Sequence, residues 1–127
     1  MESAASPPWN ILERTFQFAF RIVQLHGYLI RKPGAARVIA KQVLRSGTSI
    51  GANLEEAESA QSKADFNSKC AIATKEARET RYWLRLLAAC PVKPELIAPL
   101  TKESGELVAI LTTILKNAEA SPNRSRD

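Results

Sequence analysis

The sequence predicts an all-α fold, an up-down-up-down antiparallel four-helix bundle with a left-handed twist. Four segments place apolar residues at spacings of three and four, which is the pattern of amphipathic helices. Short connections separate them, so neighbouring helices must run antiparallel. The 127 residues, of which 45% are hydrophobic and 24% charged, can bury one core. We therefore expect one bundle domain over residues 9–118, a flexible N-terminus over residues 1–8 and a flexible polar tail over residues 119–127.

The first helix is expected from about Trp9 to Arg31 and carries two apolar stripes. One stripe contains Leu12, Phe16, Ala19, Val23 and Ile30, and the other contains Phe18, Ile22, Leu25 and Leu29. A helix that packs on one side needs one stripe, so two stripes predict that this helix is covered on two sides. The turn at residues 32–34 ends the helix, because proline cannot continue the hydrogen-bond ladder and glycine permits the reversal.

A second helix is expected over residues 35–61 and a third over residues 63–89. Ser62 and Asp65 match a capping box, in which the serine hydroxyl accepts a hydrogen bond from an early amide of the next helix. We therefore divide the two helices at Ser62. The main alternative is a three-helix bundle in which the second helix continues through this point.

The fourth helix follows a loop at residues 90–94 and extends to about Asn117. Pro99 marks either its true start or a kink after one preliminary turn. The residues expected to face inward are Leu100, Leu107, Leu111, Ile114 and Ala118.

The compartment is expected to be the cytoplasm. Cys70 and Cys90 on one helix would lie roughly 30 Å apart, too far for a disulfide. The longest apolar stretch, residues 16–30, is interrupted by polar side chains and is too short to cross a bilayer. Glu2 with no apolar run behind it argues against a secretory signal.

The predicted reversal at Ser62 gathers the positive charge at one end of the bundle. The formal net charge of the chain is +5. Four glutamates, Glu76, Glu79, Glu95 and Glu103, share that end with the cations. The cations expected there are Arg31, Lys32, Arg37, Lys41, Arg45, Arg78, Arg81, Arg85, Lys93 and Lys102. A basic end attracts polyanions, and each neutralised phosphate releases counterions.

Two interpretations of these charges remain open. In the first, nucleic acid is bound by Arg37, Lys41, Arg45, Arg78, Arg81 and Arg85, with Tyr82 as a stacking ring. In the second, the arginines pair with nearby glutamates on the surface or across subunits, which is typical of a protein–protein scaffold. Charge runs alone report solubility and partners rather than a fold.

No enzyme, cofactor or metal is predicted. His26 is the only histidine and lacks a glutamate three positions before it, so the di-iron pattern fails. No nucleophile and base form a catalytic set. The segment at residues 46–51 lacks the glycine-lysine-serine ending of a phosphate-binding loop. Close helix packing across Gly47 and Gly51 is the favoured explanation of these poor helix formers.

A homo-oligomer is predicted from the surplus of apolar surface. The first helix has two stripes, and Trp83 adds a large aromatic group beside the helix seam. Contiguous exposed apolar patches usually mark an interface. The expected oligomer-interface residues are Phe18, Ile22, Leu25 and Trp83. A ring would place several basic ends on one face.

Three segments carry a resemblance to a known family. They are residues 44–57, LRSGTSIGANLEEA, then Ala64-Asp65-Phe66, and residues 75–84, KEARETRYWL. The chain resembles the four helix bundle protein family, also called 23S rRNA intervening-sequence proteins, from about Phe16 to Lys116. The resemblance implies an all-α homopentamer without enzymatic activity. It also implies a relation to the accessory variability determinant proteins of diversity-generating retroelements, which bind nucleic acid and a reverse transcriptase.

The leading hypothesis is a non-enzymatic cytosolic bundle that forms a ring and binds RNA or DNA through its basic end. The alternative is a scaffold or accessory subunit, for example of a reverse transcriptase, that does not bind nucleic acid directly. Neither hypothesis involves a membrane.

Overall fold

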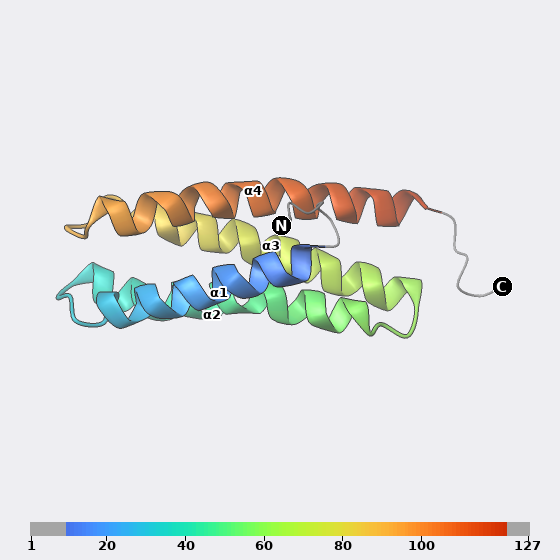
Figure 1. The fold of residues 1–127 in the computed structure, drawn as a ribbon, viewed down its shortest axis with the longest axis horizontal. Helices are drawn as coiled ribbons and strands as arrows, with labels where there is room; N and C mark the ends of the chain where they lie inside the picture. Colours follow the sequence, from blue (N-terminus) through green and yellow to red (C-terminus); the bar gives the residue numbers. More distant parts are fainter. Residues whose placement is uncertain (1–9, 122–127) are drawn as a thin grey trace.

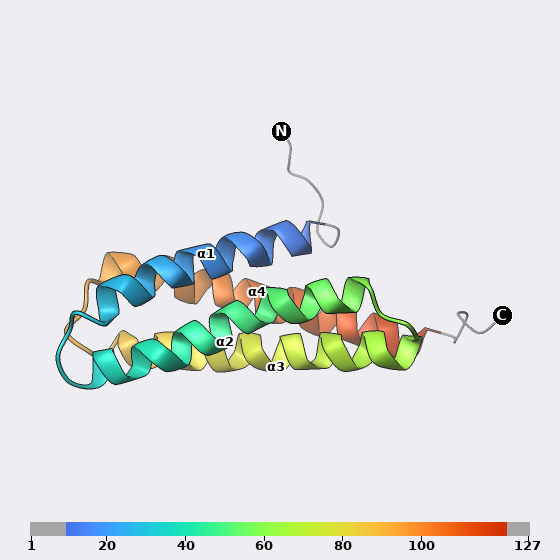
Figure 2. The ribbon, with the colours of Figure 1, turned by 90° about the horizontal axis from the view of Figure 1, so that it is seen from below.

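The computed structural model describes residues 10–121 and contains four consecutive helices in this range. Each helix runs antiparallel to the one before it, which confirms the all-α four-helix bundle (Figures 1 and 2). The predicted flexible residues 1–8 and the tail beyond residue 121 lie outside the described range. The bounds are Ile11–Leu29 for α1, Ala35–Glu58 for α2, Lys63–Leu87 for α3 and Pro94–Ala120 for α4.

The chain reverses between α2 and α3, as the capping pattern predicts. The Ser62 hydroxyl accepts a hydrogen bond from the backbone N–H of Asp65 at 3.1 Å, which satisfies one of the free amides of the first turn of α3. The alternative of a continuous helix through Ser62 is therefore wrong. α2 ends at Glu58, three residues before the predicted end, because residues 59–61 form the turn.

α4 begins at Pro94 and continues through Pro99, so Pro99 does not mark the start of the helix. Pro94 stands in the first turn, where a missing N–H costs nothing. Pro99 has no N–H to donate to the Glu95 carbonyl, so the ladder lacks that bond. The helix reaches Ala120, and residues 119 and 120 therefore belong to the bundle rather than to the tail.

The core of the bundle uses only one of the two stripes of α1. Phe18, Ile22 and Leu25 are 1%, 0% and 4% exposed, so they are buried within a single chain. This corrects the predicted oligomer interface, because these three side chains have no surface to offer a second copy. In the other stripe Phe16 is 60% and Val23 50% exposed, and Phe20, which belongs to neither stripe, is 53% exposed beside them. α1 therefore packs on the bundle through the stripe of Phe18, Ile22, Leu25 and Leu29, while Phe16, Phe20 and Val23 face outward.

Two glycines let α2 approach α1 closely. A Cβ added at Gly47 would lie 2.9 Å from Cγ2 of Ile22, closer than real Cβ atoms come to other atoms. A Cβ added at Gly51 would lie 3.2 Å from Oγ1 of Thr15. On the opposite side of α2, the buried Ser46 hydroxyl accepts a hydrogen bond from Thr80 of α3 at 2.9 Å. Small side chains therefore fix α2 between its two neighbours.

Candidate nucleic-acid interface

The α1–α2 loop, residues 30–34, and the α3–α4 loop, residues 88–93, meet over the ring of Tyr28 at one end of the bundle, which we call the loop end. The ammonium groups of Lys32 and Lys93 lie 5.2 Å and 5.9 Å from the ring centroid, in cation–π range. The backbone N–H of Lys93 also donates to the Tyr28 hydroxyl at 3.1 Å. Figure 1 shows both loops at the end opposite the α2–α3 turn. Two cations from distant parts of the sequence thus share one aromatic platform.

No acidic side chain of the described residues 10–121 neutralises either lysine. Within residues 10–121, Lys32 and Lys93 form no ion pair, and the same holds for Arg37, Lys41 and Arg85, which are all exposed. Unpaired cations keep their full charge available to a ligand, whereas a paired cation must first exchange its partner. These unpaired cations give this end of the bundle a positive surface.

Arg45 differs from the other candidate cations because it is already paired. Its guanidinium group contacts the Glu76 carboxylate at 3.3 Å and also bonds Glu79, across the α2–α3 edge. The hydrogen bond that Arg45 donates to the Glu79 carboxylate is the main reason that the pKa of Arg45 is raised. The predicted nucleic-acid-binding residue Arg45 is thus held in ion pairs by two carboxylates of its own chain.

Arg78 and Arg81 of α3 lie against α4. The Arg78 guanidinium donates to the Thr112 hydroxyl of α4 at 3.5 Å. The Nε atom of Arg81 lies 3.5 Å from the position that a Cβ would take at Gly105 of α4. Arg45 meets α3 from the α2 side instead, so Arg45 does not share a face of the bundle with these two arginines.

Trp83 contacts Glu79, one turn earlier on α3. Its indole N–H donates to the Glu79 carboxylate at 2.9 Å, and its ring lies edge-on to Tyr82, 5.2 Å between centroids. Trp83 is half-buried against the core, while Tyr82 is exposed. The indole hydrogen bond is the largest cause that lowers the pKa of Glu79 below its usual 4.5, and Arg45 adds to it.

This environment predicts a pH dependence of stability. The pKa of Glu79 is lower in the fold than in the unfolded chain, so its stabilising contribution is present above about pH 4.5 and is lost as the pH falls below that value. We expect Glu79→Gln to show a shallower loss of stability than the wild-type chain between pH 5 and pH 3, measured by urea unfolding with circular dichroism. Glu58→Gln, at an exposed position, is the control and should follow the wild type. Identical pH profiles for Glu79→Gln and wild type would contradict the assignment.

Sequence reasoning missed Tyr28, although the signal was present. Tyr28 and Lys32 are four residues apart, and such a pair shares one helix face. Lys32 lies in the loop, three residues after the end of α1, and its ammonium group still lies over the ring of Tyr28. The convergence of Lys93 on the same ring could not be read from the sequence, because it depends on how α4 starts relative to α1.

Two other classes of site find no support in the described residues. Between residues 10 and 121, no three histidine, cysteine or acidic side chains gather to hold a metal ion. None of the described helices has the length and apolar character needed to cross a membrane.

The family model described as 23S rRNA-intervening sequence protein matches residues 9–113. The chain belongs to this family. A similar solved structure, from Bacteroides thetaiotaomicron VPI-5482, is described as a protein with unknown function from the S23 ribosomal protein family. It has a TM-score of 0.75 and 43% sequence identity, covering 84% of this chain and 98% of that chain. No match was found among curated proteins. The predicted membership of the 23S rRNA-intervening sequence family is thus confirmed.

Proposed function

We propose that this 23S rRNA-intervening sequence family member is a non-enzymatic, cytoplasmic bundle that binds RNA or DNA through the loop end. The observation that carries the proposal is the convergence of Lys32 and Lys93 on Tyr28, with no acidic partner for either lysine in the described chain. Lysines of this kind neutralise phosphates, while an aromatic ring can support a base. Arg37, Lys41 and Arg85 extend the positive surface away from the ring.

Binding is tested by fluorescence anisotropy with labelled single-stranded and duplex RNA and DNA at rising salt. We expect micromolar or tighter binding at low salt and a linear fall of log K with log salt, with a slope of roughly −0.7 to −0.9 for each phosphate contacted. An absence of binding to every oligonucleotide at low salt would remove the proposal. A co-purifying protein without nucleic acid would favour the accessory-subunit alternative.

The same proposal includes a homo-oligomeric ring, a pentamer by resemblance, that uses the outward stripe of α1. Phe16, Phe20 and Val23 are each at least half exposed, and they lie on one helix face. We expect the wild-type chain to have a native mass of several subunits and the double variant Phe16→Glu, Phe20→Glu to be a folded monomer. Val38→Glu, at an exposed apolar residue of α2, is the matched control. A monomeric wild type would contradict the ring.

A further inference from the structure

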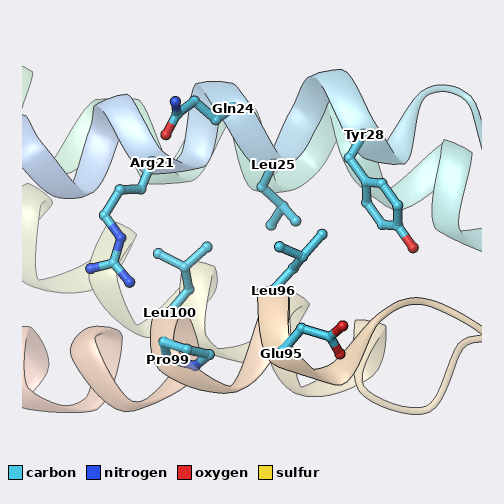
Figure 3. Close-up of a pocket in the computed structure, with 8 residues that line it drawn as sticks. All are labelled: Arg21, Gln24, Leu25, Tyr28, Glu95, Leu96, Pro99 and Leu100. Atoms are coloured by element: carbon cyan, nitrogen blue, oxygen red, sulfur yellow. The ribbon is translucent and has the colours of Figure 1, made fainter.

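A pocket opens between α1 and α4 next to the loop end. It has a volume of about 210 Å³, several times the roughly 30 Å³ that one water occupies. Leu25 of α1 and Leu96, Pro99 and Leu100 of α4 form its apolar part. Figure 3 shows Arg21 near one end of the pocket, with Glu95 and Tyr28 near the other. The pocket therefore has an apolar middle between two opposite charges.

The two charged side chains of the pocket are both unpaired. The side chains of Arg21 and Glu95 form no hydrogen bond or ion pair in the part of the chain that the structure describes, and they do not pair with each other. Arg14 lies two turns earlier on the same helix and gives the contrast: it bonds Glu103 at 2.7 Å and also Glu106. Ion pairs thus join α1 to α4 at Arg14, whereas at Arg21 no ion pair joins the two described helices and a pocket lies between them.

The chemistry of the pocket fits a flat ring with acceptors on one edge and N–H donors on another. A guanidinium fork matches the paired acceptors N7 and O6 of guanine, the commonest specific arginine contact with a base. The carboxylate of Glu95 can accept from the N1 and N2 donors of the same base. Adenine places a donor beside N7, which opposes the guanidinium group, and uracil offers neither the paired acceptors nor the second donor.

Resting on the proposed function, we infer that this pocket binds an unstacked guanine of a single strand. Tyr28 lines the pocket and also lies beneath the ammonium groups of Lys32 and Lys93. The phosphate of the bound nucleotide therefore lies at these two lysines, while its base enters between α1 and α4. Arg21 and Glu95 select the base, and the leucine side chains cover its faces. Nucleic-acid binding at this end thereby acquires a preference for guanine.

The base pocket is tested apart from strand binding, with mononucleotides. ¹⁵N-labelled protein is titrated with GMP, and amide shifts are followed at residues 21–28 and 95–100. We expect saturable shifts with GMP and roughly tenfold weaker binding of UMP, which carries the same phosphate. Arg21→Gln and Glu95→Gln should each abolish the difference between the two nucleotides. Lys75→Gln and Glu58→Gln, at exposed positions away from the pocket, should preserve it.

A second measurement separates failure of the pocket from failure of the proposed function. A ten-nucleotide uridine strand is compared with the same strand carrying one central guanosine. Tighter binding of the guanosine strand, lost in Arg21→Gln, supports the inference. Equal binding of both strands, together with equal GMP and UMP shifts, overturns the pocket but leaves the basic surface intact. If neither strand binds, the proposed function fails, and the GMP titration still decides whether the pocket takes the base.

Discussion

Exchanging Lys32 and Lys93 together for glutamate is expected to lower the affinity for single-stranded RNA at low salt by roughly tenfold to a hundredfold. The two ammonium groups lie at 5.2 Å and 5.9 Å from the same ring centroid, so one strand can meet both. Losing two phosphate contacts should also make the slope of log K against log salt shallower by roughly 1.4. Both quantities come from one series of anisotropy titrations.

The matched control for this double exchange is Lys75→Glu with Lys116→Glu. It changes the net charge by the same amount at exposed positions away from the loops. If nucleic acid responds only to net charge, both double variants will lose affinity equally, and the assignment of the loop end is then wrong. Circular dichroism should show that both remain folded, because none of the four lysines is buried.

The second large effect is expected at Gly47. Replacing Gly47 by alanine places a methyl group 2.9 Å from Cγ2 and 3.0 Å from Cγ1 of Ile22, a fully buried and branched side chain that cannot move away easily. Overpacking of this kind costs about 1–3 kcal/mol, which exceeds the gain of about 1 kcal/mol in helix propensity. We expect a net loss of stability, measured as a lower urea midpoint with an unchanged slope.

Gly27 supplies the control for Gly47, because it is a helical glycine in open space. A Cβ added there meets nothing within 4 Å. Gly27→Ala should therefore raise the free energy of unfolding by up to about 1 kcal/mol through helix propensity alone. The two substitutions are chemically identical and should have opposite signs. A stabilising Gly47→Ala would show that α1 and α2 are free to move apart.

The helices and their connections follow from local patterns in the sequence. Periodic apolar residues predict each helix, and the Ser62 cap predicts the reversal that the structure places at residues 59–62. The glycines at 47 and 51 predict a close approach because nothing local favours them in a helix. These features depend on neighbours in the chain, so they can be inferred without knowing how the helices pack.

Which face of each helix is buried cannot be inferred from local patterns in the same way. The two stripes of α1 are similarly apolar, and only the orientation of α1 against Gly47 and Gly51 decides that Phe18 is buried and Phe16 exposed. The pairing of Arg45 likewise depends on the register of α2 against α3. Equal spacing in two helices therefore predicts a stripe on each, but not that the stripes adjoin.

The uneven placement of charge on an elongated molecule has a kinetic meaning. The unpaired cations flank the loops at one end, while Glu55 and Glu58 lie in the last turn of α2, next to the α2–α3 turn. Figure 1 shows this turn at the end opposite the two loops. Such a molecule carries an electric dipole along its length. The field of a polyanion therefore orients the protein, with its positive end forward, before the two molecules touch. Encounters then occur tip first, and added salt slows association more than it hastens release.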